Sequence, residues 1–303
     1  MTQLVPAADG GALAVDCIGA PDGKPVFLLH GTPGSRHGPR PRGVVLQRLG
    51  VRLICYDRPG YGESSRRPGR TVSDSADDVS AIADALGLGV FGVVGRSGGG
   101  PHALACAALL PGRVERAAVL VGLAPADAPD LDWFAGMTRS NVEEYTSADD
   151  DVSAVEADLT ERTDHILHDP EYLLRFLLPE LTSSDRRVIE DVGIRRLLID
   201  TYAEALRRGP DGWIDDVLGA RRPWKFELSD ISVPVLLWHG ADDMFSPVEH
   251  TLWLADQIAH ATLRVEPGVA HFGAVEVLPQ VLAWMVDPAA RTRFASAGTG
   301  FAP

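Results

Sequence analysis

The sequence predicts an α/β protein with a mainly parallel central sheet, helices on both faces of that sheet and an inserted helical lid. Strand-like and helix-like stretches alternate up to about residue 125, and the alternation resumes at residue 231. Between these points the chain shows helical spacing only. A strand–helix–strand rhythm is typical of parallel sheets whose faces are covered by helices. We therefore expect a core formed by residues 1–125 and 229–303, with a helical cap over residues 126–228.

The first core strands are short and apolar. Residues 12–19 (ALAVDCIG), 25–31 (PVFLLHG) and 51–57 (VRLICYD) have strand character, and the second is a continuous apolar run that favours burial on both faces. Residues 75–87 predict a helix, because they combine an acidic first turn, apolar residues at helical spacing and a closing glycine.

The same alternation covers the remaining core segments. Apolar and β-branched runs predict strands, and longer stretches with helical spacing predict helices. In chain order these are strand 90–95, a helix after Ser97, strand 114–122, strand 231–240, helix 248–259, strand 261–268 and helix 275–286. The small and polar tail after Pro288 predicts a frayed end.

The charge of the chain is unevenly distributed. The formal net charge is −14, which argues against a nucleic-acid partner because it repels phosphate backbones. Residues 126–228 hold 24 Asp and Glu against 12 Lys and Arg, so nearly all of the excess lies in the expected cap. We interpret this surplus mainly as a solvated surface, with a substrate amine as an alternative partner for one or two of its acids.

Other features of the composition predict a cytoplasmic protein. No apolar run approaches the ~18 residues that a membrane span requires, and the first residues lack the pattern of a secretory signal. The three cysteines, Cys17, Cys55 and Cys106, lie in apolar or alanine-rich stretches. Their odd number favours free, buried thiols in a reducing compartment.

The stretch FGVVGRSGGG, residues 91–100, places a serine among glycines between an expected strand and an expected helix. A single residue between two such elements takes a strained backbone conformation, and its side chain projects from the turn. The residues two positions before and after it then approach closely, so only small side chains fit. Gly95 and Gly99 supply this elbow geometry around Ser97, matching the pattern G-x-S-x-G.

A nucleophilic serine needs a base that is oriented by an acid, and the chain offers both in the order that this sheet topology favours. Asp243 follows strand 231–240, and His271 lies in the loop after the next strand. Both positions fall at the carboxyl ends of parallel strands, where such sheets build their sites. Asp242 and Asp127 remain alternatives for the acid.

These motifs resemble the α/β-hydrolase fold superfamily, specifically lid-bearing serine hydrolases of the esterase and proline-iminopeptidase type. The resemblance covers nearly all of residues 12–286. The stretches that carry it are LLHGTPGSR for the oxyanion loop, YDRPGYGES for the following turn, GRSGGG for the nucleophile elbow, HGADDMFSP for the acid loop and GVAHF for the histidine loop. Gly98 departs from the aromatic residue that follows the serine in proline iminopeptidases, which disfavours the peptidase activity within this superfamily.

Each residue of the expected site then has a role. Ser97 attacks a carbonyl carbon, His271 takes up and returns the proton, and Asp243 orients the imidazole. The backbone N–H groups of Thr32 and Gly98 are the expected oxyanion hole, where one donor is worth ~3 kcal/mol.

Several further polar residues have structural interpretations. We expect His30 and His239 to hold loops, and His102 to be a packing residue of the elbow helix. Asp57 and Arg58 are expected to join the turn after their strand.

His165 and His168 have the i, i+3 spacing of a helical metal site, but the sequence offers no third ligand, so no metal is expected. Arg96 is a candidate substrate contact that could receive a carboxylate, although we favour its pairing with a neighbouring acid. Aromatic residues of the cap are expected to build its core and to line part of the pocket roof: Trp133, Phe134, Tyr145, Tyr172, Phe176, Trp213, Trp224 and Phe226.

The function predicted from these residues is a serine esterase or lactonase that acts on a small molecule through an acyl-enzyme intermediate. It requires no cofactor and no membrane, and the oligomeric state stays open. An aminopeptidase or amidase with the same triad is an alternative, as is a ligand-binding protein on the same fold. An epoxide or haloalkane hydrolase is disfavoured, because those relatives carry Asp in place of Ser97.

Overall fold

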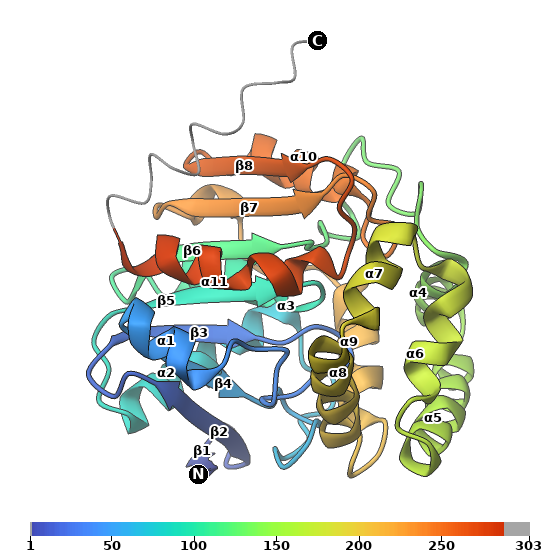
Figure 1. Ribbon diagram of the computed structural model, residues 1–303, viewed down its shortest axis with the longest axis horizontal. Coiled ribbons are helices and arrows are strands. Elements are labelled where there is room, and N and C mark those ends of the chain that lie inside the picture. The colour runs from blue at the N-terminus through green and yellow to red at the C-terminus, as the bar shows by residue number, and fades with distance from the viewer. Residues whose placement is uncertain (1, 288–303) are drawn as a thin grey trace.

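The computed structural model describes residues 2–287 and contains, within that range, an eight-stranded sheet in the order β1-β2-β4-β3-β5-β6-β7-β8 (Figure 1). Its strands are β1 (Gln3–Pro6), β2 (Ala12–Gly19), β3 (Lys24–Leu29), β4 (Val51–Tyr56), β5 (Phe91–Arg96), β6 (Val114–Leu120), β7 (Val235–Gly240) and β8 (Ala261–Glu266). The pairs β1–β2 and β2–β4 are antiparallel and all others are parallel, so the prediction of a mainly parallel sheet is confirmed.

Helices cover both faces of the sheet, as expected. One hydrophobic cluster joins the sheet to three helices, α2 (Ser75–Ala85), α3 (Gly99–Leu109) and α10 (Val248–Gln257). A second cluster joins the opposite face to α1 (Gly43–Leu49) and α11 (Gly273–Val286), which lie in front of the sheet in Figure 1. Strands with apolar side chains on both faces, such as β5, separate these two clusters.

The described elements differ from the predicted ones mainly at their ends. β1 is an additional antiparallel edge strand that the sequence pattern did not indicate. The strand expected over 231–240 begins only at Val235, because the chain first forms a 3₁₀ turn at Leu228–Asp230 and then passes Pro234, which has no N–H for the ladder. The expected frayed tail after Pro288 lies outside the described residues.

Between β6 and β7 the chain forms a group of helices, which we call the inserted helices. They are α4 (Arg139–Asp150), α5 (Val152–His168), α6 (Tyr172–Leu177), α7 (Ser183–Glu190), α8 (Val192–Ala205) and α9 (Asp211–Ala220). Figure 1 shows them beside the carboxyl ends of the parallel strands. They bury a hydrophobic cluster of their own, which Tyr61, Phe245 and Phe272 of the sheet loops complete.

Two aromatic residues assigned to the cap belong elsewhere. Trp224 and Phe226 pack in the cluster between the sheet and α3, because the chain has already returned to the sheet at this point.

The three cysteines are free; Cys55 and Cys106 are buried, whereas Cys17 is only partly buried. No helix within residues 2–287 is both long and apolar enough to cross a membrane.

Candidate active site

Ser97 lies in the tight turn between β5 and α3. Its φ of 53° falls in the left-handed region, and its backbone N–H donates to Leu120 O at 2.8 Å. A Cβ placed on Gly95 would lie 2.2 Å from Gly99 O, and one placed on Gly99 would lie 2.3 Å from Leu29 O. The two flanking glycines are therefore required by close backbone contacts, and the turn exposes the serine side chain beside the start of α3.

His271 and Asp243 meet at the same edge of the sheet. His271, in the loop between β8 and α11, donates from Nδ1 to Asp243 Oδ2 at 2.8 Å. Asp243, in the loop after β7, accepts from the backbone N–H of Phe245 at 2.8 Å and of Ser246 at 3.1 Å. These contacts fix the carboxylate and leave Nε2 of the imidazole facing away from it.

Asp243 is almost fully buried and remains ionised. Burial acts to raise its pKa, but His271 and the nearby His239, whose Nε2 lies 3.4 Å from Oδ2, outweigh burial and lower the pKa below its usual range. Asp242 and Asp127, the alternatives for this position, are both exposed. Of the three acids, Asp243 is the one that contacts the imidazole.

Ser97 and His271 line one cavity of about 780 Å³, a volume that includes solvent at its mouth. Within residues 2–287 no hydrogen bond joins Ser97 Oγ to the imidazole, so the structure brings the pair to one cavity without linking them. The inserted helices contribute mostly apolar and aromatic walls: Tyr145, Leu173, Phe176, Leu177, Tyr202 and Trp213. Of the aromatic residues expected in a pocket roof, Tyr145, Phe176 and Trp213 are at this cavity.

The backbone around Thr32 and Gly98 forms the wall next to the serine. A Cβ on Gly98 would lie 2.3 Å from Thr32 Oγ1 and 3.4 Å from Thr32 N, so the two residues are in direct contact. In the described part of the chain, neither backbone N–H donates to a protein acceptor. Two free amide donors therefore stand together beside Ser97.

A buried carboxylate from α9 holds Thr32 in place. Asp216 Oδ2 accepts from Thr32 Oγ1 at 2.8 Å and from the Tyr61 hydroxyl at 2.9 Å, while Arg58 and Arg70 form ion pairs with it. Burial opposes its ionisation, but the two guanidinium groups hold its pKa well below the usual range. Thus α9 and the loop after β3 are connected through one ionic cluster.

A second buried carboxylate holds the histidine loop. Asp185 Oδ1, on α7, accepts from the backbone N–H of Phe272 at 2.8 Å, immediately after His271. Neither Asp185 nor Asp216 was expected at the site from the sequence, because both belong to the acidic surplus of residues 126–228, which is typical of a solvated surface. The signal that was available for Asp216 was its place in the apolar stretch GWIDDVLG.

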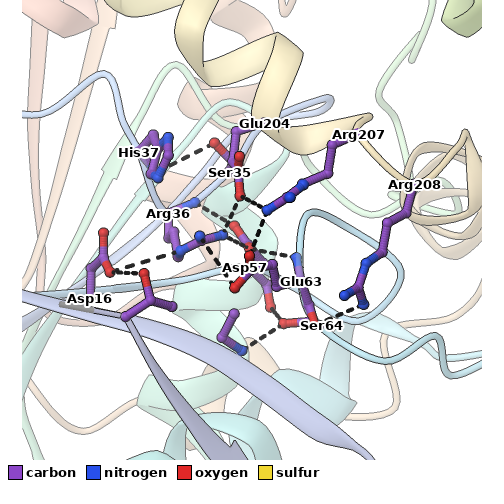
Figure 2. A network of polar contacts seen from close by, with 12 residues as sticks. Asp16, Ser35, Arg36, His37, Asp57, Glu63, Ser64, Glu204, Arg207 and Arg208 are labelled. Carbon is purple, nitrogen blue, oxygen red and sulfur yellow. Dashed lines mark hydrogen bonds and ion pairs between the residues drawn. The ribbon is translucent and has the colours of Figure 1, made fainter. Parts of the chain in front are cut away.

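Arg36 links the inserted helices to the core at another point, shown in Figure 2. Its guanidinium lies among four carboxylates: it forms an ion pair with Asp57, contacts Glu204 of α8 at 2.7 Å, and lies 3.7 Å from Glu63 and 3.8 Å from Asp16. Asp57 also accepts from Arg36 N at 2.7 Å and Glu63 N at 3.2 Å. It therefore joins the turn after its strand, as expected.

Arg58 does more than join that turn. Its guanidinium donates to the carbonyls of His30 and Gly31 and reaches Asp216 on α9, 158 positions further along the chain. His30 accepts from Arg58 N at 3.1 Å, so it holds a loop as predicted. The two residues together fix the backbone that leads into Thr32.

The other histidines have the structural contacts expected of them. His239 bonds Thr251 Oγ1 and Ser246 O, both at 2.6 Å, and His102 bonds Ser75 Oγ at 2.7 Å. Within residues 2–287 no group of three or more His, Cys, Asp or Glu side chains is arranged to hold a metal ion.

Arg96 does not pair with an acid, contrary to the interpretation favoured from the sequence. It is buried, with an exposed fraction of 6%, and among the described residues no carboxylate lies within ion-pair distance of it. Its polar neighbour is the Tyr202 hydroxyl, and its Nη1 has no hydrogen-bond partner. Burial lowers the pKa of the guanidinium, although Tyr202 and Asp243 act to raise it. The two oxygens of Asp243, the acid that acts on Arg96 electrostatically, accept from Phe245 N and His271 Nδ1.

Comparison with known proteins agrees with this architecture. The chain is 26% identical to a non-heme chloroperoxidase of Streptomyces lividans, over 92% of this chain and 95% of the relative. It is 27% identical to a proline iminopeptidase of Lactobacillus helveticus, over 87% and 88% of the two chains. A thermophilic esterase from Thermogutta terrifontis has the same fold, with a TM-score of 0.64, 24% identity and coverage of 98% of both chains.

The strongest finding is a match to a family model. Residues 24–276 match the model described as alpha/beta hydrolase fold, and this range contains the serine turn, the acid loop and the histidine loop. The chain is an enzyme that belongs to the alpha/beta hydrolase fold family.

Proposed function

We propose that this protein is a serine hydrolase that cleaves a small ester or lactone through an acyl-enzyme intermediate. One observation carries the proposal: a serine in a strained turn and a histidine bonded to a buried carboxylate line the same cavity. Serine alone is a weak nucleophile, and this pairing supplies the base and its orientation.

In the proposed mechanism Ser97 Oγ attacks the substrate carbonyl while His271 Nε2 takes up its proton. Asp243 keeps the Nδ1 proton on the side away from the serine and stabilises the imidazolium that forms. His271 then protonates the leaving alcohol. Water then attacks the acyl-enzyme while His271 takes up its proton, and the return of this proton to Ser97 Oγ releases the carboxylic acid. The Ser97–His271 hydrogen bond forms when substrate fills the cavity, since such contacts often tighten only in the complex.

The carbonyl oxygen becomes negatively charged during both steps. The free N–H groups of Thr32 and Gly98 stand where they can donate to it, and the Asp216 cluster keeps Thr32 in that position. The inserted helices act as a lid in this proposal, because their apolar side chains enclose the cavity and exclude water around the acyl group.

An ester or lactone fits this cavity better than an amine-bearing peptide. Two arginines, Arg96 and Arg162, line the cavity. The carboxyl group of Glu144 also lines it, but this group already contacts Arg162 at 3.3 Å and Trp213 Nε1 at 3.3 Å. Burial raises the pKa of Glu144 to about 7. A free substrate amine would therefore meet more positive than negative charge.

Ser97→Ala tests the proposal. We expect this variant to lose on the order of 10⁴-fold or more in kcat for short-chain p-nitrophenyl esters and to lose labelling by a fluorophosphonate. Thermal unfolding of the variant serves as the control for folding. Wild-type turnover by Ser97→Ala would exclude the serine mechanism. If the enzyme instead hydrolysed aminoacyl amides faster than every ester, and N-acetylation of these amides abolished their hydrolysis, the protein would be an aminopeptidase and not an esterase.

A further inference from the structure

A buried guanidinium without a counter-charge is unusual, and Arg96 is in that state. A charge removed from water costs several kcal/mol unless an opposite charge and hydrogen bonds replace the solvent. Arg96 Nη1 has no hydrogen-bond partner, and in residues 2–287 no carboxylate forms an ion pair with the side chain. The folded chain therefore leaves unsatisfied hydrogen-bonding capacity and positive charge at this position.

The guanidinium is close to the reacting group. A Cβ placed on Gly31 would lie 3.4 Å from Ser97 Cβ and 3.5 Å from Arg96 Nη2, so one small residue touches both side chains. Arg96 also lines the cavity that contains Ser97 and His271. An anion bound by Arg96 would thus lie within a few bonds of the carbonyl that Ser97 attacks.

The second arginine of the cavity is in a different state. Arg162 contacts Glu144 at 3.3 Å and Asp158 at 2.7 Å, and it lies over the Phe176 ring at 4.7 Å. Its charge and its planar face are thus already used within the inserted helices. Among the cavity-lining residues that the structure describes, Arg96 is the cation that lacks an acid.

We propose that Arg96 binds a carboxylate of the substrate, so that the enzyme acts on short half-esters of dicarboxylic acids or on lactones that carry a carboxylate. This inference rests on the proposed hydrolase function and narrows its substrate class. Arginine suits the role because its fork of N–H donors matches a carboxylate in shape and charge. The Tyr202 hydroxyl, next to the guanidinium on α8, supplies a further donor from the inserted helices.

The first experiment compares two esters of matched length, mono-p-nitrophenyl glutarate and p-nitrophenyl valerate, at pH 6.5. They differ at the end of the acyl chain, where one has a carboxylate and the other a methyl group. We expect the wild type to favour the glutarate ester in kcat/KM by about 10- to 100-fold, the range for a charge-assisted hydrogen bond. Arg96→Met should bring this ratio close to one, and Arg96→Lys should leave an intermediate ratio.

Arg162→Met is the matched control, since it removes a positive charge from the same cavity. Burial raises the pKa of Glu144 to about 7, so this side chain is mostly protonated at pH 6.5 and the control leaves no unpaired anion in the cavity. We expect Arg162→Met to keep the wild-type preference within about threefold. An equal loss of preference in both variants would assign the effect to the general potential of the cavity and overturn the proposal. A wild type without preference would also overturn it.

The second experiment measures binding without turnover. Titration calorimetry of the Ser97→Ala protein with glutarate should give saturable binding, weakened about tenfold or more in the Ser97→Ala/Arg96→Met protein. Equal binding by both proteins, or none by either, would refute the carboxylate site even if ester hydrolysis stands. Conversely, if glutarate binding depends on Arg96 but ester turnover survives Ser97→Ala, the serine hydrolase mechanism would be refuted and the carboxylate site would stand. Thermal unfolding verifies folding, and without glutarate Arg96→Met should melt no lower than the wild type.

Discussion

Ser97 owes its conformation to its neighbours. A φ of 53° is unfavourable for a residue with a Cβ, and it persists here because β5 and α3 are both anchored in the sheet core. The Ser97 N–H bond to Leu120 O ties the strained residue to the adjacent strand β6. The strain therefore fixes the direction of the side chain before any substrate binds.

Replacing Gly95 should disrupt this turn. A methyl group at this position would lie 2.2 Å from Gly99 O, and neither backbone segment can move without displacing a packed element. We expect Gly95→Ala to lower the free energy of unfolding by at least about 3 kcal/mol in urea denaturation.

Gly43→Ala is the control for this substitution. Gly43 begins α1, no atom lies within 4 Å of an added Cβ, and alanine favours a helix. The free energy of unfolding should therefore stay within about 1 kcal/mol of the wild type. Equal effects of Gly95→Ala and Gly43→Ala would contradict the close approach of Gly95 and Gly99.

At the scale of elements, the inserted helices do more than cover the cavity. α9 reaches Thr32 through Asp216, α7 reaches the residue after His271 through Asp185, and α8 reaches Arg36 through Glu204. Each contact joins a buried or half-buried polar group of a helix to a loop at the carboxyl edge of the sheet. The positions of the site loops thus depend on the packing of these helices.

Asp216→Asn should test the connection through α9. The substitution removes the negative charge between Arg58 and Arg70 while keeping the size of the side chain, so two buried guanidinium groups lose their counter-charge. We expect a loss of about 3–5 kcal/mol in the free energy of unfolding, measured by denaturation. A fall in kcat should accompany it, because Thr32 loses its charged partner.

Asp211→Asn on the same helix is the comparison. Its ion pair with Arg66 is largely exposed, with side-chain exposures of 44% and 35%, and such pairs contribute at most about 1 kcal/mol. If Asp211→Asn proved as destabilising as Asp216→Asn, the special position of the Asp216 cluster would be refuted.

For the whole molecule, one buried acid links stability to pH. Burial raises the pKa of Glu144 from its usual 4.5 to about 7, despite the Arg162 contact, and its side chain is 8% exposed. At pH values between 4.5 and about 7, Glu144 holds a proton in the folded protein but loses it in the unfolded chain. Stability must then fall as the pH rises through this window.

Glu144→Gln should remove this dependence. We expect the fall in unfolding free energy between pH 4.5 and pH 8 to be about 3 kcal/mol larger for the wild type than for the variant, measured by urea denaturation at both pH values. The comparison between variants cancels the other titrating groups. Identical pH profiles would mean that Glu144 is ionised across the whole range.

Local patterns in the chain were sufficient for most strands and helices of the core and for the strained serine turn, but not for the helix α1. Apolar periodicity reports whether a segment is a strand or a helix, and the spacing of Gly95, Ser97 and Gly99 encodes a backbone geometry. The edge strand β1 was not predicted, because its four residues are mostly exposed and give no periodic signal.

Contacts between segments that are distant in the sequence could not be predicted from these local patterns and are seen only in the folded structure. Thr32 and Asp216 are 184 positions apart, and the sequence places Asp216 in an acidic region that resembles a solvated surface. In the same way, Arg96 lies next to the serine in the chain, yet only the folded structure shows that no carboxylate of the described residues forms an ion pair with it. Short-range periodicity sets the backbone of each element, whereas the pairing of buried charges depends on which side chains meet when those elements pack.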